Sequence, residues 1–269
     1  MTIDNEIFNK LIKELGREID FDKEETKEIR EIVTEGGIIF ERFLKLVSKE
    51  RKSENKVNVE VAKILFDYGA VHFINKPYIF SSGVFSPIYI DNRILISFPS
   101  ARNIIIDIFL KIINESKFKP EVIAGIESSG IPWASWIADR LNLPLIYIRK
   151  KRKDYGTQNL IEGCIKKDEK KVILIEDLIS TGDSLIHGVR ALRERYYDII
   201  LVLSLFSYEF KKSIEKLEKE NVLLFSLTDL STIIKVNSKM NYFSPQTIID
   251  LRKWKEDPYN YYKEETIGD

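Results

Sequence analysis

Short, continuously apolar runs alternate with segments of helical spacing through most of the chain after residue 100. Runs of this kind are typical of parallel strands that are buried on both faces. The predicted strands are residues 122–125, 145–148, 172–175, 199–205 and 222–227. The predicted helices are residues 101–114, 131–141, 184–195 and 211–220. The pattern predicts an α/β fold, in which a parallel sheet is flanked by helices and joined by right-handed crossovers.

The segment before this alternation predicts a smaller structure. Residues 57–69 have the pattern of a helix that ends at Gly69, and residues 78–83 and 88–93 are predicted to be extended, with turns between them. Ligands of open parallel sheets bind beyond the carboxyl ends of the strands. We therefore expect the chemistry of this protein in the loops that follow the predicted strands.

The first 55 residues differ from the rest of the chain. They are rich in charge, contain no proline, and place apolar residues such as Ile7, Leu11 and Leu15 at helical spacing. The sequence predicts two domains: a helical N-terminal extension over residues 1–55, to which no residue assigns a role, and a main domain over residues 56–269.

The composition excludes several classes of function. Lys and Arg number 42, as do Asp and Glu, so the formal net charge is 0 and a general electrostatic grip on nucleic acid or an anionic membrane is not expected. The single cysteine, Cys164, excludes an internal disulfide, and two histidines argue against a His-rich metal site or a Ser/His/Asp triad. With no secretory signal pattern and no apolar run of about 20 residues, we expect a soluble, cytoplasmic protein without membrane or nucleic-acid partners.

The most informative stretch follows the predicted strand at 172–175. Two adjacent carboxylates, Glu176 and Asp177, are followed by a loop that leads into the next helix. The loop residues are Ser180, Thr181, Gly182, Asp183 and Ser184. Backbone N–H groups, hydroxyls and the positive end of the helix favour a phosphate, and carboxylates accept hydrogen bonds from ribose hydroxyls. The stretch indicates a ribose 5-phosphate site; the alternative is an ordinary strand–turn–helix with a Ser or Thr N-cap.

A run of five cations, at 149–153, follows the predicted strand at 145–148. Because these side chains repel one another, we expect an open, solvated loop that closes over an anionic ligand such as a pyrophosphate. A solvated charge run without function is the alternative, but the position directly after a parallel strand favours a ligand site.

Both loops resemble those of a known family. Residues 176–184, two acids followed by a small Thr/Gly-containing loop, resemble the ribose-phosphate motif of the type I phosphoribosyltransferases. The sequence RKKRKDYG at 149–156, followed by IEG at 161–163, resembles the catalytic loop of the orotate phosphoribosyltransferases. Other stretches that resemble this family, in the family's order, are residues 69–71, 80–83, 86–93, 97–99, 125–132 and 205–209. The resemblance covers about residues 57–255 and does not include the extension.

The resemblance implies a fold, a reaction and a set of site residues. The fold is the type I phosphoribosyltransferase fold, a parallel sheet flanked by helices with a small hood. The reaction converts orotate and phosphoribosyl pyrophosphate (PRPP) to orotidine 5′-phosphate and pyrophosphate in de novo pyrimidine (UMP) synthesis. The implied residues are Lys153, Arg149 and Tyr155 for catalysis; Arg149, Lys150, Lys153, Tyr155, Ser128 and Ser129 for the pyrophosphate; Glu176 and Asp177 for the ribose; Ser180, Thr181, Gly182, Asp183 and Ser184 for the 5-phosphate; and Ser180, Tyr89 and Arg93 for orotate.

A cofactor and a partner are also implied. Mg²⁺ is expected on the pyrophosphate, without a direct protein ligand, because two adjacent phosphates need more charge compensation than lysines alone supply. The catalytic loop of this family reaches into the site of the neighbouring subunit, so the resemblance implies a homodimer.

The sequence departs from the family pattern at three places. Tyr155 stands where many members carry histidine, Phe85 where a basic residue is often found, and Ser207-Tyr208 where some branches carry Asp-Arg. The departures at Phe85 and at Ser207-Tyr208 make the identity of the nucleobase less secure than the use of PRPP. Two alternatives therefore stay open: a phosphoribosyltransferase for another base, and a regulator that binds PRPP without turnover.

Two groups of aromatic residues are expected to be structural. Trp133 and Trp136 lie three residues apart on the predicted helix at 131–141 and should pack in the core or in a dimer interface. The tail at 254–262 should dock against its own domain or against a partner subunit.

Overall fold

The computed structural model describes residues 56–80, 82–116, 118–151, 159–164, 170–240 and 242–261, with the backbone alone at 74–77 and 239. Two sets of predictions lie outside the described residues: the helical extension at 1–55 and the loop residues Lys153 and Tyr155. Within the described part, no helix is long and apolar enough to cross a membrane.

A six-stranded sheet forms the centre of the main domain. In spatial order its strands are β5 (Ile161–Glu162), β4 (Leu145–Ile148), β3 (Val122–Ile126), β6 (Lys171–Ile179), β7 (Asp198–Ser207) and β8 (Leu224–Asp229). Every neighbouring pair is parallel except β4 with the short β5. The predicted α/β fold with a mostly parallel sheet is confirmed, and β5 is the one described strand of this sheet that the sequence analysis does not predict.

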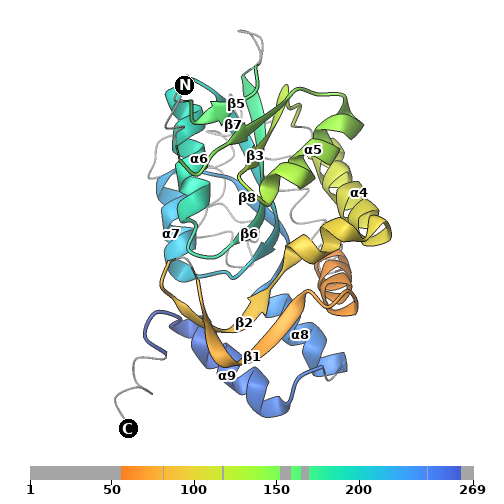
Figure 1. Ribbon diagram of the computed structural model, residues 1–269, viewed down its shortest axis with the longest axis vertical. Helices are drawn as coiled ribbons and strands as arrows, with labels where there is room; N and C mark the ends of the chain where they lie inside the picture. The colour runs from red at the N-terminus through yellow and green to blue at the C-terminus, as the bar shows by residue number, and fades with distance from the viewer. Residues whose placement is uncertain are drawn as a thin grey trace, which may run out of the picture. The chain divides into compact units, whose positions relative to one another are not determined.

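Helices cover both faces of this sheet (Figure 1). The described helices of the domain include α4 (Pro99–Glu115), α5 (Gly130–Leu141), α6 (Asp183–Glu194), α7 (Lys211–Lys219), α8 (Leu230–Met240) and α9 (Pro245–Glu256), with a further helical segment at 56–67. Of these, α9 packs against the strand Phe85–Ile90 and not against the six-stranded sheet. Side chains alternate along a strand, so Ile173 and Ile175 of β6 join the core on the α4 and α5 face, whereas Val172 and Leu174 join the core under α6. This double burial explains why the strand sequences are continuously apolar.

Strand β6 is longer than predicted. The sequence analysis ends it at Ile175, but it continues to Ile179 because β7 also continues, to Ser207, and supplies hydrogen-bonding partners. Glu176 is paired in register with Ser204 of β7. The two acids therefore belong to the last part of the strand and not to the loop after it, which fixes their backbone.

A two-stranded ribbon and the short 3₁₀ helix that follows it form the hood that the resemblance implies. Strand β1 (Val71–Ile79) pairs antiparallel with β2 (Phe85–Ile90). The predicted extended segment at 88–93 is wrong at its end, because Asn92–Ser97 forms a 3₁₀ helix, η2. The Asp91 carboxylate caps this helix by accepting a hydrogen bond from a backbone N–H of its first turn.

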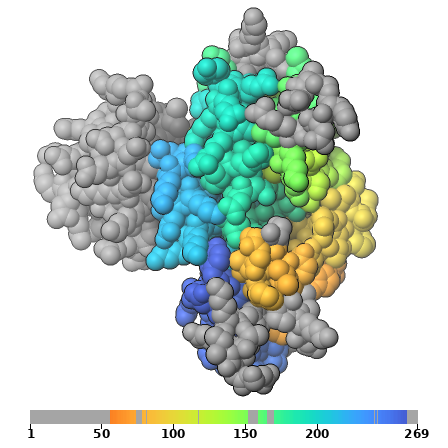
Figure 2. Space-filling view, turned by 60° about the vertical axis from the view of Figure 1, so that its left-hand side comes forward, coloured from red at the N-terminus to blue at the C-terminus, as the bar shows by residue number. Residues whose placement is uncertain are grey.

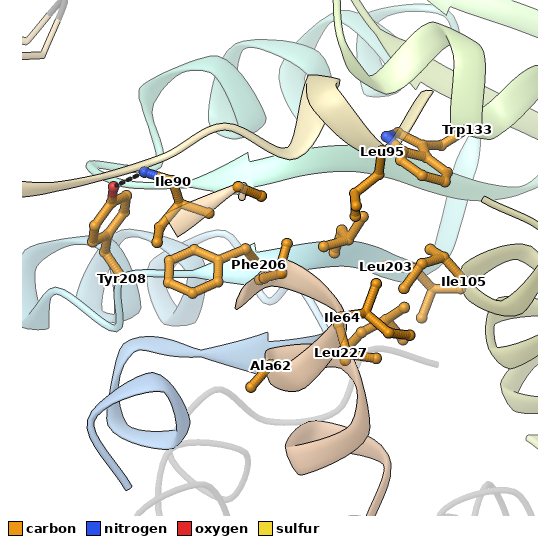
Figure 3. Close-up of a cluster of buried hydrophobic side chains, with 14 of the residues drawn as sticks. Ala62, Ile64, Ile90, Leu95, Ile105, Trp133, Leu203, Phe206, Tyr208 and Leu227 are labelled. Carbon is orange, nitrogen blue, oxygen red and sulfur yellow. Dashed lines mark hydrogen bonds between the residues drawn. The ribbon is translucent and has the colours of Figure 1, made fainter. Parts of the chain in front are cut away.

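One buried tyrosine ties the hood to the sheet. Tyr208 directly follows β7 and is fully buried. Its hydroxyl accepts a hydrogen bond from the Ile90 N–H at 3.2 Å (Figure 3) and donates one to the Ile88 carbonyl at 3.3 Å. Burial raises the pKa of Tyr208, so the hydroxyl keeps the proton that it donates. Strand β2 thus has its outer backbone groups satisfied by a side chain.

The C-terminal helices α8 and α9, which the sequence analysis does not predict, add to the same core. The fully buried Trp254 of α9 donates its Nε1–H to the Phe85 carbonyl of β2 at 2.7 Å. The tail was predicted to dock against its own domain or against a partner subunit. Trp254 docks against its own domain. Trp133 of α5 is also fully buried in the core of its own domain, and Trp136 is half-buried beside it.

We expect Tyr208→Phe to lower the free energy of unfolding by about 1–2 kcal/mol, because it leaves the buried Ile90 N–H of β2 without a partner, whereas the Ile88 carbonyl keeps the Ser86 hydroxyl at 2.6 Å. Urea denaturation of the full chain measures this. Tyr196→Phe is the matched control, since Tyr196 is 85% exposed and should lose nothing. A Tyr208→Phe variant as stable as the control would show that this hydroxyl does not secure the hood.

Candidate active site

Two adjoining cavities lie at the carboxyl end of the sheet. The larger, of about 240 Å³, is lined by predicted residues from four separate stretches of the chain: Tyr89, Arg93, Ser128, Ser129, Lys150, Glu176, Asp177, Ser180 and Ser184. The smaller, of about 150 Å³, is lined by all of the predicted phosphate-loop residues, Ser180, Thr181, Gly182, Asp183 and Ser184, and also by Ser82 of the hood. The hood lies against the N-terminal end of α6, where this loop enters the helix, in the space-filling view (Figure 2). The fold therefore brings the separate motifs to one place.

Of the two acids of β6, Glu176 lines both cavities and Asp177 lines the larger one. Glu176 is 5% exposed, and its Oε1 accepts the backbone N–H of Asp177 at 3.0 Å. Burial, reinforced by the neighbouring Asp177 charge, raises the pKa of Glu176 well above its ordinary value, and burial also raises the pKa of Asp177. Buried carboxylates with raised pKa values at a cavity are typical of a ligand site, where cations or hydroxyl donors of the ligand stabilise them.

The phosphate loop opens directly into α6. Gly182 is the N-cap residue, with a φ of 78°, a left-handed conformation that glycine adopts without strain. No side chain caps the helix at this residue. The first N–H groups of α6 therefore lie at the cavity lined by the loop, where the helix end favours an anion.

The loop after β3 comes close to the acids because of a glycine. A Cβ placed on Gly130, the first residue of α5, would lie 2.7 Å from the Ile175 carbonyl oxygen, so another side chain would force α5 away from β6. Ser128 and Ser129 precede this glycine and line the larger cavity. Glu127 accepts the Lys150 backbone N–H at 2.8 Å, and so joins the loop after β3 to the start of the basic loop.

The basic loop is only partly described. Lys150 lines the larger cavity. Arg149 lines neither cavity: its guanidinium lies 3.8 Å from Oε1 of Glu162 and donates to the Lys151 carbonyl at 3.3 Å. The role assigned to Arg149 at the pyrophosphate stays a prediction.

The hood contributes a held arginine. Arg93 donates from Nε to Asp91 Oδ1 at 2.6 Å and from its terminal nitrogen to the Tyr89 hydroxyl. Its side chain is 55% exposed and lines the larger cavity, so the guanidinium is oriented and still accessible. Burial, followed by the charge of Asp91, raises the pKa of Tyr89, which therefore stays a neutral hydroxyl.

Sequence reasoning missed three contributors to this site. Asn92 is 1% exposed and donates from Nδ2 to the Asp177 carbonyl at 2.7 Å, which fastens η2 to β6. The aromatic rings of Tyr78 and Phe80 also line the larger cavity. Asn92 lies between Tyr89 and Arg93, two predicted site residues of the segment at 86–93. This position in the sequence was the only sign that it belongs to the site. For Tyr78 and Phe80, the sequence showed only that they belong to the predicted extended segment at 78–83.

Comparison with known proteins agrees with this arrangement. The Phosphoribosyl transferase domain family matches residues 98–242. The chain is 41% identical over 209 residues to the orotate phosphoribosyltransferase of Enterococcus faecalis, which covers 77% of this chain and 99% of that protein. The orotate phosphoribosyltransferase of Coxiella burnetii is 38% identical over 203 residues, or 75% of this chain and 97% of that protein. The chain belongs to the orotate phosphoribosyltransferase family.

Solved structures of this family share the fold. The orotate phosphoribosyltransferase from Aeropyrum pernix superposes with a TM-score of 0.56 at 27% identity, over 68% of this chain and 99% of that one. The UMP synthase of Leishmania donovani gives a TM-score of 0.63 at 29% identity, over 74% of this chain but 42% of that one. The predicted family and the type I phosphoribosyltransferase fold are confirmed.

The raised pKa of Glu176 predicts a pH-dependent stability. The folded protein holds this proton more tightly than the unfolded chain, so the contribution of the group is fully present below its ordinary pKa of 4.5 and is lost as the pH rises through the raised value. Glu176→Gln cannot ionise. We expect this variant to have a higher free energy of unfolding than the wild type at about pH 8, and a smaller advantage at about pH 5.

Urea titrations at both pH values measure this difference. Glu215→Gln, an exposed change on α7, is the matched control and should give no pH-dependent difference. A Glu176→Gln variant less stable than the wild type at about pH 8 would contradict the desolvation argument.

Proposed function

We propose that this protein is an orotate phosphoribosyltransferase, which converts orotate and PRPP to orotidine 5′-phosphate and pyrophosphate in pyrimidine biosynthesis. The family supports this reaction. The observation that carries the proposal is the pair of adjoining cavities, which combine ribose-binding carboxylates, a phosphate loop and an arginine on the hood side.

PRPP fits these cavities in one orientation. The loop at 180–184 holds the 5-phosphate at the N-terminus of α6. Glu176 and Asp177 accept hydrogen bonds from the ribose hydroxyls. The pyrophosphate then lies towards residues 128–129 and Lys150, which line the larger cavity but not the smaller one.

The basic loop completes the pyrophosphate site in this proposal. Arg149 exchanges Glu162 for the pyrophosphate, which offers the guanidinium a doubly charged partner. Lys153 and Tyr155 follow in the same loop. Closure of the loop excludes water and strengthens each of these contacts.

Orotate lies under the hood. Its carboxylate pairs with Arg93, which Asp91 and Tyr89 already hold in place. Ser180 offers a hydroxyl at the boundary between the base and the ribose. The sequence lacks the Asp-Arg pair of other branches after β7, and Arg93 is a cation of the larger cavity that can replace it.

The reaction needs little covalent help from the protein. The bond from the ribose C1 to pyrophosphate breaks as N1 of orotate bonds to C1, and the proton of N1 passes to the pyrophosphate or to water. Positive charge therefore develops on the ribose and negative charge on the leaving group. Glu176 and Asp177 lie on the ribose side, and Lys150 and Lys153 on the pyrophosphate side. Catalysis is therefore positioning combined with electrostatic stabilisation.

Magnesium and a second subunit complete the proposal. No group of three or more His, Cys, Asp or Glu side chains is placed to hold a metal within the described residues. Four carboxylates line the larger cavity: Glu127 and Asp91 already accept hydrogen bonds from Lys150 and Arg93, and Glu176 and Asp177 lie side by side on β6. This donor set suits Mg²⁺ bound mainly through the substrate's phosphates and water. When bound, it would neutralise charge on the pyrophosphate. We also propose a cytoplasmic homodimer in which the basic loop reaches the partner's site.

We expect Lys153→Ala to lower kcat by about 100–1,000-fold, the usual cost of removing one donor to developing charge. Pyrophosphate release from PRPP, orotate and Mg²⁺ measures this. Lys151→Ala is the matched control. It removes a cation from the same loop, and Lys151 lines neither of the two cavities. If Lys153→Ala turned over as fast as the control, Lys153 would not be the catalytic lysine.

A panel of bases tests the proposed function itself. We expect pyrophosphate release with orotate and little with uracil, adenine or hypoxanthine, because orotate alone carries the carboxylate that Arg93 would bind. Arg93→Met should lower kcat/KM for orotate by about tenfold or more, while Arg252→Met, an exposed change on α9, should not. Preference for another base would support the first alternative, and PRPP binding without pyrophosphate release would support the regulator.

A further inference from the structure

The phosphate loop contains a negative charge of its own. Asp183 is the first residue of α6 and lines the smaller cavity, together with the hydroxyl-bearing residues that would hold a phosphate. A carboxylate at this place would repel a dianionic phosphate at short range unless another group compensates it.

A lysine from the next helix meets this carboxylate. Lys216 of α7 donates from Nζ to Asp183 Oδ1 at 2.5 Å and to the Thr181 carbonyl at 3.1 Å. The Thr181 hydroxyl donates to the other oxygen, Asp183 Oδ2, at 2.8 Å. Both carboxylate oxygens are therefore engaged, Oδ1 by α7 and Oδ2 by the loop itself.

The packing of α7 places Lys216 there. Ser213, one turn earlier, is buried against the loop, and a Cβ on Gly182 would lie 3.4 Å from the Ser213 Cβ. Residues three apart lie on the same face of a helix, so Lys216 faces the loop as well. Burial alone would raise the pKa of Asp183, but the hydrogen bonds from Lys216 and Thr181 outweigh it and lower the pKa. The Asp183 carboxyl is thus ionised at neutral pH.

We propose that Lys216 is a positioning residue for the 5-phosphate of PRPP. It neutralises Asp183 and holds the carboxylate turned away from the anion, so that the loop presents N–H groups and hydroxyls. The inference rests on the proposed function in so far as the ligand is a 5-phosphorylated ribose. Helix α7 lines neither cavity, but through Lys216 it affects the affinity of the loop for phosphate.

Four forms of the full-length protein test this: the wild type, Lys216→Met, Asp183→Asn and the double variant. Isothermal titration calorimetry with ribose 5-phosphate at low salt gives each Kd without any turnover. We expect Lys216→Met to weaken binding about tenfold, because the carboxylate is then uncompensated. Asp183→Asn should tighten binding about threefold, because the Lys216 charge is then unopposed. The double variant should recover most of the loss seen in Lys216→Met.

The double comparison separates charge compensation from a merely structural link. If Lys216 only fastened α7 to the loop, Asp183→Asn would break the same link and would weaken binding too. Lys219→Met, an exposed lysine on the same helix, is the matched control and should change the Kd by less than about twofold. Lys216→Arg should retain binding, and in steady-state assays Lys216→Met should raise KM for PRPP and leave KM for orotate and kcat unchanged.

Either of two results with the variants would overturn the inference: a Lys216→Met variant that binds ribose 5-phosphate as the wild type does, or an Asp183→Asn variant that binds it more weakly than the wild type. A wild type that does not bind ribose 5-phosphate would also overturn it. By contrast, a wild type that binds ribose 5-phosphate with the expected pattern of variants, but releases no pyrophosphate with orotate, would refute the proposed function and leave the role of Lys216 standing.

Discussion

Two adjacent carboxylates at the buried end of a central strand are the constraint on which this site depends. Glu176 and Asp177 lose hydration when β6 pairs with β7, and the raised pKa values of both record that cost. The described structure brings Lys150 to the same cavity. A ligand with both hydroxyls and anionic groups stabilises this arrangement best, because the hydroxyls bond to the acids and the anionic groups pair with the cations. PRPP is such a ligand.

The hood turns this charged end of the sheet into an enclosed site. Tyr208 satisfies the outer edge of β2, and Asn92 fastens η2 to the backbone of Asp177. These two hydrogen-bonding side chains set where Arg93 lies relative to Glu176 and Asp177. Position on the hood, and not charge alone, makes Arg93 suitable for the base, since its guanidinium is already oriented by Asp91.

The sequence was a good guide wherever a feature depends on neighbouring residues, and a poor one wherever it depends on pairing. Predicted strands and the phosphate loop were placed well because apolar runs and small polar loops are local patterns. The end of β6 was misplaced because it depends on the length of β7. Asn92 and Lys216 act on residues 85 and 33 positions away in the chain, and no local pattern reveals such contacts.

A crystal structure of the full chain with PRPP and Mg²⁺ tests the central claim most directly. The account predicts density for the 5-phosphate within the loop at 180–184, and ribose hydroxyls within about 3 Å of the carboxylates of Glu176 and Asp177. The pyrophosphate should lie beside Lys150. A PRPP molecule bound in the reverse direction, or bound with both acids left unengaged, would contradict it.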